Sequence, residues 1–212
     1  MNTHLCSLTL LGNLVDKPII RYQANPVVAI AEIVVATHSR WLDKGTQKYK
    51  EWTSYHTVKV IGDIVDAALV HAQKGDVILI HGYLLNSKKS AREIIHATFA
   101  QTFAKGYAQS LNQIQCSGII CENVQLVQTE HNKELAEITI EINHQVHSPI
   151  KQAMHDFSLQ RKVHVWGKQA HYIHEYAKIG DALVVEGKLN YLKNAQKSQF
   201  IEARQVVLLK NQ

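Results

Sequence analysis

Val58-Lys-Val-Ile-Gly62 returns 105 positions later as Val163-His-Val-Trp-Gly167, and this pair of segments decides the fold. One offset that holds over more than fifty residues, with glycine matching glycine, indicates that a small fold has been duplicated. The sequence therefore predicts two similar units of about 100 residues each, a size that can bury its own core. The same offset aligns three further pairs of segments: Ala31-Glu-Ile33 with Ala136-Glu-Ile138, Gly75-Asp76 with Gly180-Asp181, and Gly82 with Gly187.

Positive charge is in modest excess and is unevenly distributed. The chain has 23 Lys and Arg against 18 Asp and Glu, a formal net charge of +5. Residues 1–106 hold 12 basic and 8 acidic side chains, whereas residues 107–212 hold 11 and 10. This balance favours a polyanionic partner, with the first half as the stronger binder. The 13 histidines predict anion binding that strengthens on acidification.

Several classes of protein are disfavoured by what the sequence contains. We find no apolar run of about 20 residues, so no membrane partner is expected, and no secretory signal follows Met1. Three cysteines fit reduced thiols in a cytoplasmic protein. Cys116, Cys121 and His131 could be imagined as zinc ligands, but no paired CxxC motif supports them. We therefore expect no enzymatic activity, no metal and no cofactor.

The hydrophobic pattern predicts an all-β fold. In the first unit, alternating or β-branched runs predict five strands: residues 8–14 continued by 18–22, then 28–37, 55–61, 77–82 and 94–99, with a polar hairpin over 38–53. Residues 63–73 have helical spacing and end at Lys74-Gly-Asp76. This order is that of a five-stranded Greek-key β-barrel with a short helix between strands three and four. The second unit repeats it, which gives domains at 1–100 and 116–212 and a linker at 101–115, where a short helix remains open.

The third strand of each unit presents an alternating outward face. In the first unit this face is predicted to hold Tyr55, Thr57, Lys59 and Ile61, and in the second Gln160, Lys162, His164 and Trp166. Each face combines an aromatic ring with a cation. Flat rings stack on bases and cations neutralise phosphates, so this combination is typical of single-strand binding.

The first unit resembles the bacterial single-stranded-DNA-binding proteins, a family built on the OB-fold. The resemblance covers about residues 5–99 and rests on the order and spacing of separate motifs. Those motifs are Leu11-Gly-Asn-Leu14, Lys17-Pro18, Arg21-Tyr22, Ala36-Thr-His-Ser-Arg-Trp-Leu-Asp-Lys44, Lys50-Glu-Trp-Thr-Ser-Tyr-His-Thr-Val58, Lys74-Gly-Asp76 and Ile80-His-Gly82.

The resemblance implies tandem OB-folds that bind single-stranded DNA without sequence preference, in replication, recombination, repair or DNA transfer. Trp41 matches the family's first stacking tryptophan, Tyr55 replaces the second, and Ile61 replaces a phenylalanine. Trp166 matches that phenylalanine position in the second unit. By the same resemblance, we expect a nucleoid-associated bacterial homodimer that presents four OB-folds. Replication or recombination proteins are possible partners, although the chain lacks the family's acidic recruitment tip.

The residues expected to bind DNA are the exposed rings and cations of the third strands and the two hairpins. They are Trp41, Tyr55, Arg40, Lys44, Lys48, Lys50, Trp52, Lys59, Lys88, Lys89, Arg92, Lys162, Trp166, Tyr191 and Lys193.

One alternative function stays open on the sequence alone. The strands of the second unit look as much like primosomal replication protein N as like the main family. The OB-folds could then mainly contact proteins, as an accessory module of a primosome or mobile element.

Overall fold

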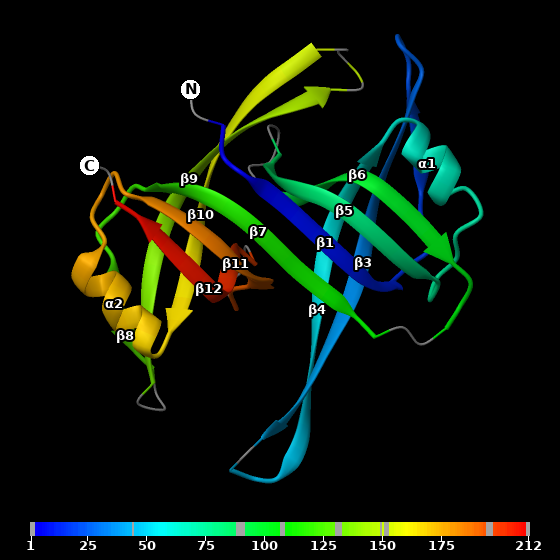
Figure 1. Ribbon diagram of the computed structural model, residues 1–212. Coiled ribbons are helices and arrows are strands. Elements are labelled where there is room, and N and C mark those ends of the chain that lie inside the picture. The colour runs from blue at the N-terminus through cyan, green and yellow to red at the C-terminus, as the bar shows by residue number, and fades with distance from the viewer. Residues whose placement is uncertain are drawn as a thin grey trace. The chain divides into compact units, whose positions relative to one another are not determined.

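The computed structural model describes residues 3–43, 45–87, 92–106, 109–129, 133–148, 150, 153–193 and 197–210. The chain divides into two compact units (Figure 1). One is built mainly from Leu8–Asn112, and the other mainly from Gln113–Ser148 and Ala153–Gln212. Strands dominate both units, and each unit contains one short helix.

The first unit is a closed barrel. Strand β1 pairs with both β3 and β5, β3 pairs with β4, β5 pairs with β6, and a parallel pairing of β4 with β6 closes the ring. The short strand β2 extends the ring only at the edge of β3. The elements are β1 (Cys6–Leu14), β2 (Ile20–Gln23), β3 (Val28–Asp43), β4 (Lys48–Ile61), α1 (Asp63–Ala68), β5 (Val77–Asn86) and β6 (Glu93–Phe103).

The second unit repeats these pairings strand for strand. Strand β7 pairs with β9 and β11, β9 with β10, β11 with β12, and β10 closes the ring in parallel with β12. The predicted fold class, two five-stranded OB barrels with a helix between strands three and four, is confirmed. The elements are β7 (Leu111–Ile120), β8 (Gln125–Gln128), β9 (Glu134–Ser148), β10 (Ala153–Trp166), α2 (Lys168–Tyr176), β11 (Ala182–Tyr191) and β12 (Gln199–Leu209).

The repeated segments Val58–Gly62 and Val163–Gly167 supply buried residues to the two cores. Val58 and Val60 are fully buried in the first barrel, as are Val163 and Val165 in the second. Residues of a strand alternate between its two faces, so burying these valines turns the intervening side chains outward. Each fully buried aliphatic side chain stabilises the fold by about 1.5–3 kcal/mol, and the core therefore fixes which residues the barrel presents to solvent.

Matching glycines lie where two strands of each barrel come closest. A Cβ atom on Gly82 would lie 2.2 Å from the backbone oxygen of His96, and one on Gly187 would lie 2.2 Å from that of Glu202. In both barrels the pairing register shifts at this point, as at a β-bulge. No larger residue fits at either position, which explains why this glycine survives in both copies of the unit.

Three local predictions differ from the structure. The hairpin predicted over 38–53 is present, but its flanking strands are longer than predicted: β3 runs to Asp43 and β4 begins at Lys48, because backbone groups complete a ladder even without apolar alternation. Helix α1 is shorter than predicted and ends at Ala68. Strand β6 runs to Phe103 and β7 begins at Leu111, so strands occupy both ends of the segment expected as a linker, and none of its described residues is helical.

Candidate nucleic-acid interface

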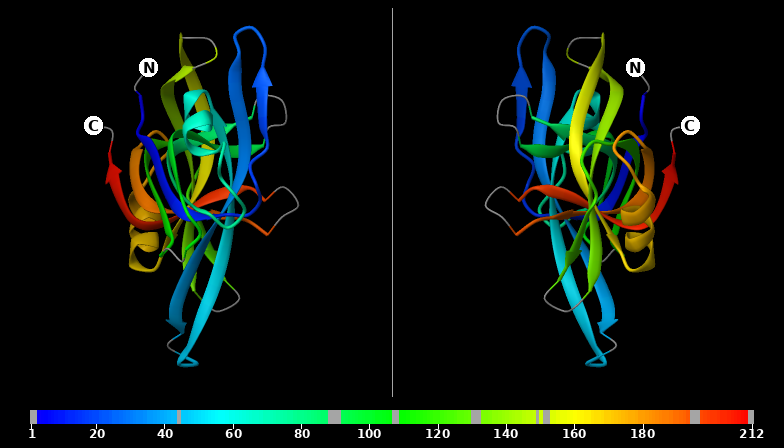
Figure 2. Two further views of the ribbon diagram at one scale, coloured as in Figure 1. Left: turned by 90° about the vertical axis from the view of Figure 1, so that its right-hand side faces the viewer. Right: turned by 90° about the vertical axis from the view of Figure 1, so that its left-hand side faces the viewer.

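Strands β3 and β4 continue beyond the barrel of the first unit as a two-stranded ribbon. They remain paired from Ile30 and Ile61 to Asp43 and Lys48. Ser54 and His56 are still buried in the barrel, whereas every residue of β4 from Lys48 to Trp52 is exposed. Figure 1 shows this ribbon leaving the barrel, and Figure 2 shows it, in blue and cyan, from two other sides.

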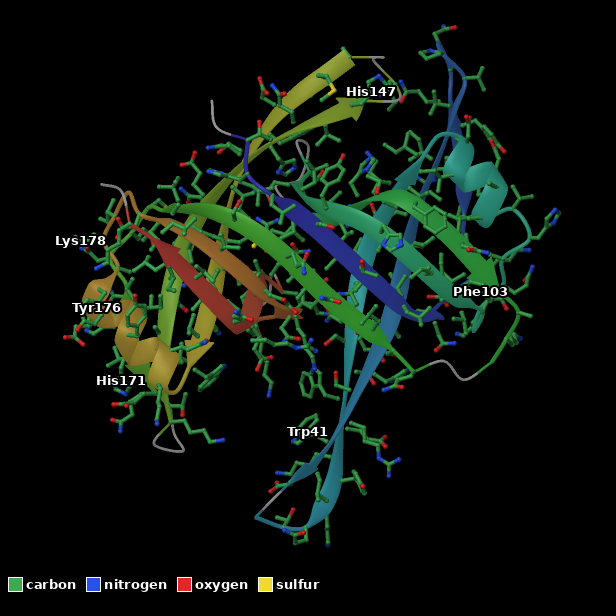
Figure 3. The ribbon with its side chains drawn as sticks, viewed as in Figure 1. Trp41, Phe103, His147, His171, Tyr176 and Lys178 are labelled. Atoms are coloured by element: carbon green, nitrogen blue, oxygen red, sulfur yellow. The ribbon has the colours of Figure 1, made fainter. Side chains whose placement is uncertain are left out.

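The pairing register distributes the rings of the ribbon over two faces. Trp41 lies opposite Lys50 and Trp52 lies opposite Ser39, so both indoles belong to the face that continues the barrel interior. Tyr55 belongs to the other face. Trp41 is 46% exposed, Trp52 51% and Tyr55 58%. Figure 3 shows Trp41 projecting from the ribbon. A nucleic-acid strand that contacts both Trp41 and Tyr55 must follow the twist of the ribbon or cross its edge.

Arg40 adds a cation to the face that holds Tyr55. Its guanidinium carbon lies 4.3 Å from the centre of the Tyr49 ring, and its Nε lies 3.5 Å from a carboxylate oxygen of Glu51. A cation over an exposed ring is stabilised by about 0.5–1 kcal/mol. Arg40 and Tyr49 therefore form a preassembled pair of a flat ring and a cation.

Lys50 pairs with Asp43 near the hairpin tip. The hydrogen bond from Lys50, followed by backbone N–H groups of Gly45 and Thr46, lowers the pKa of Asp43 to about 2. The Lys50 side chain is 55% exposed and that of Asp43 20%, so a phosphate that binds Lys50 competes with this carboxylate. Lys48 is exposed and makes no ion pair with any residue that the structure describes.

On the barrel wall, Tyr55, Thr57 and Lys59 point outward from β4, as predicted. The prediction for Ile61 is wrong, because this side chain is only 7% exposed and belongs to the core. Strand β4 ends there, and α1, which packs against β4, follows directly. The outward row of β4 is therefore one residue shorter than the alternation indicates.

Lys59 lies in a row of side chains that crosses the barrel wall. Its register partners are Glu32 on β3 and His96 on β6, and His96 lies opposite Tyr83 on β5. The His96 and Tyr83 rings are stacked, with centroids 5.0 Å apart. Burial, and then the charge of Lys59, lowers the pKa of His96 to about 4, so this histidine is neutral at pH 7.

Arg92 approaches the same row from the segment before β6. Both terminal nitrogens of its guanidinium donate to Glu32, at 3.1 and 3.0 Å. This fork-like pairing leaves Lys59 without an ion pair among the described residues. Lys44, Lys88 and Lys89, the other predicted cations of this unit, lie outside the described residues.

The corresponding wall of the second barrel holds its cations differently. Lys162 donates to Glu137 at 2.5 Å, and the His164 ring lies 3.1 Å from the other oxygen of the same carboxylate. Burial lowers the pKa of His164 despite this carboxylate. Trp166 lies at the end of β10 and is partly exposed, while Tyr191 is half-buried and Lys193 exposed.

The second ribbon, formed by β9 and β10, keeps a ring at the Trp52 position, where Phe157 lies 6.0 Å from the His144 ring, but it lacks the rings of Trp41 and Tyr55. Val146 and Gln160 lie where the 105-residue offset places Trp41 and Tyr55. Exposed residues on this ribbon include His147, labelled in Figure 3, and Met154. Stacking positions are therefore concentrated on the first unit.

Comparison with known protein families identifies the family of this chain. The model of the single-strand binding protein family matches residues 5–100 and again residues 111–211. The chain belongs to this family. The likeness of the second unit to primosomal replication protein N, in contrast, stays a prediction.

Two solved structures of the single-stranded DNA binding protein from Thermus aquaticus share the fold. The wild-type structure matches at 20% sequence identity and a TM-score of 0.78, covering 100% of this chain and 96% of its own. A deletion mutant of that protein matches at 21% identity and a TM-score of 0.81, covering 100% and 98%.

Two carboxylates of this single-strand binding protein escaped the sequence prediction. Glu32 and Glu137 occupy equivalent positions; Glu32 pairs with Arg92, and Glu137 pairs with Lys162. The sequence contains a signal that could have revealed them, because strand alternation turns both glutamates outward beside the predicted basic rows. The predicted site was built from cations and rings alone, so the acidic side chains that face them were missed.

The part of the chain that the structure describes contains neither a grouped set of metal ligands nor a helix that could span a membrane. There, no three His, Cys, Asp or Glu residues are grouped as ligands, and no helix is long and apolar enough to cross a membrane. Cys116 is buried on β7, which raises the pKa of its thiol. His131, the third imagined zinc ligand, lies outside the described residues.

Proposed function

We propose that this protein binds single-stranded DNA without reading its sequence, mainly through the first barrel. The observation that carries the proposal is the β3–β4 ribbon, where exposed rings alternate with cations on a continuous paired ladder. Every base offers a ring face, and each stacked base contributes about 1–3 kcal/mol irrespective of its identity. The cations neutralise phosphates, and affinity therefore falls with salt.

The proposed DNA contacts fall into two groups. Trp41, Trp52 and Tyr55 supply stacking surfaces, and Arg40 with Tyr49 supplies a combined one. Phosphate contacts come from the basic side chains of both barrels. In the first barrel these are Lys48, Lys50, Lys59 and Arg92, together with Lys44, Lys88 and Lys89; in the second they are Lys193 and, more weakly, Lys162, beside the rings of Trp166 and Tyr191.

The test is fluorescence anisotropy with a labelled thymidine oligonucleotide of about 35 nucleotides, compared with a duplex of the same length. Wild-type protein should bind the single strand far more tightly than the duplex. The variant Trp41→Ala/Tyr55→Ala should lose two stacked bases, about 2–6 kcal/mol. Tyr172→Ala, which removes an exposed ring from α2, is the matched control and should bind as wild type. Equal affinity for duplex and single strand would contradict the proposal.

We also propose that the chain forms a homodimer and so presents four barrels. Support comes from the outer face of β5 and β6, where Phe99 and Phe103 are exposed and the Phe99 ring lies 5.5 Å from that of His81. Exposed apolar patches of this kind often mark protein interfaces. Light scattering should give about twice the 24.0 kDa chain mass. Phe99→Lys should shift that mass toward the monomer, and a monomeric wild type would refute the dimer.

A further inference from the structure

The two barrel walls can be compared row by row, because both barrels share their pairing pattern. In the first barrel, the central row consists of Glu32, Lys59, His96 and Tyr83. In the second barrel, the register gives Glu137, His164, Glu202 and Lys188 at the same places. The position of neutral His96 is thus taken by a carboxylate, and that of Lys59 by a histidine.

Glu137 holds two potential phosphate ligands at once. One oxygen accepts from Lys162 at 2.5 Å and the other lies 3.1 Å from the His164 ring. Hydrogen bonds from Lys162 and His164 lower the pKa of Glu137 against the opposing effect of burial, so the carboxylate is charged at pH 7. The Phe200 ring, 4.3 Å from that of His164, and Glu202 on β12 complete the surroundings.

The equivalent carboxylate of the first barrel has the opposite effect on its row. Glu32 is occupied by Arg92, which reaches it from outside the row, and Lys59 makes no ion pair among the described residues. The Glu32–Arg92 pair is also more exposed than the carboxylate of Glu137, whose side chain is only 27% exposed. Partly buried pairs are screened less by water and salt, so a phosphate displaces Glu137 from Lys162 less readily than it displaces Glu32 from Arg92.

We propose that Glu137 is a specificity-determining residue that keeps the second barrel in a low-affinity state for single-stranded DNA. It does so by occupying Lys162 and His164 and, together with Glu202, by repelling phosphates. The two barrels then share a fold but differ in affinity: the first binds single-stranded DNA, and the second binds it only weakly. This inference rests on the proposed function and assigns the difference between the barrels to one carboxylate.

The test uses the full chain with the first barrel disabled by Trp41→Ala/Tyr55→Ala. Adding Glu137→Gln releases Lys162. One added phosphate contact steepens the salt dependence of single-strand affinity by about 0.7 in log–log slope, about fivefold in affinity near 0.1 M salt. Adding Glu175→Gln on α2 instead makes the same charge change outside the row and should give little gain. Equal affinities for the two variants, or no binding by either at about 20 mM salt, would overturn the proposal.

Two further variants separate a local effect from misfolding. Lys162→Met added to Glu137→Gln should abolish the gain, whereas a gain that persists would overturn the role of Lys162. In the otherwise unaltered chain, Lys162→Met should weaken affinity less than Lys59→Met, which should weaken it about fivefold. An equal loss from both would overturn the inference even if Glu137→Gln fails to fold. Binding by wild-type protein, measured alongside, reports separately on the proposed function.

Discussion

Acidification should destabilise the first barrel through two histidines that the fold keeps neutral. His56 is fully buried and shares a 2.9 Å hydrogen bond with Thr37 Oγ1. Burial lowers its pKa from 6.5 to about 4. Burial, and secondarily Lys59, brings the pKa of His96 to about 4 as well. In the unfolded chain both groups return to about 6.5, so the unfolded state binds more protons between pH 6.5 and 4.

The sign and size of the change in unfolding free energy follow from this difference in pKa. A histidine with a lowered folded-state pKa contributes stability above pH 6.5 and loses it as the pH falls toward 4. Between pH 7.5 and pH 5, each histidine costs about 2 kcal/mol of unfolding free energy, about 4 kcal/mol together. Most domains have only about 5–15 kcal/mol of stability, so the loss is large. The sequence-based expectation that acid strengthens anion binding is therefore opposed by unfolding of the binding barrel.

Denaturant unfolding at pH 7.5 and pH 5, followed by tryptophan fluorescence, measures the effect. Two of the three tryptophans, Trp41 and Trp52, lie in the first unit and report on it. Wild-type protein should lose about 4 kcal/mol more than the variant His56→Gln/His96→Gln, and each single variant should recover about half of that. His71→Gln, an exposed histidine of the same unit, is the control. The reasoning is refuted if the double variant keeps the full wild-type pH dependence.

Three further results are expected. Gly187→Ala should lower the unfolding free energy by about 1–3 kcal/mol, because its Cβ would overlap the Glu202 oxygen. The control Gly106→Ala, whose Cβ would have no described neighbour closer than 3.8 Å, should leave the unfolding free energy unchanged. Equal denaturation midpoints for the two variants would contradict this prediction. Tyr55→Ala should cost about 1–3 kcal/mol of oligonucleotide binding with little change in stability, as titration and melting together would show. Ile61→Ala should do the reverse, losing about 2–5 kcal/mol of stability; weakened binding by a stably folded Ile61→Ala protein would count against its core position.

Repetition and alternation made most of the fold predictable. The 105-residue offset predicts two copies, and buried valines at alternate positions predict the outward faces of β4 and β10. The extent of β3 and β4 could not be predicted in the same way. Beyond residue 38, the ribbon is stabilised by backbone pairing and cross-strand contacts such as the 2.9 Å hydrogen bond between His38 and Thr53, which leave no apolar period.

The candidate site was predictable as a set of residue types but not as an arrangement. Alternation counted from β4 gives the exposure of Tyr55 and Lys59, and it fails at Ile61 because the end of the strand is covered by another element. That Trp41 and Tyr55 lie on opposite faces follows only from the register between β3 and β4. The capture of Lys162 by Glu137 depends on a diagonal contact between strands, which no single-strand pattern contains.

In the proposed complex, the rings of the first ribbon stack on bases beside cations that neutralise phosphates. The most direct measurement is fluorescence of the variant Trp166→Phe, in which Trp41 and Trp52 are the remaining tryptophans, during titration with a thymidine oligonucleotide of about 35 nucleotides. We predict strong quenching that weakens steeply as salt rises. Unquenched fluorescence at low salt, with the oligonucleotide present in excess, would contradict the claim.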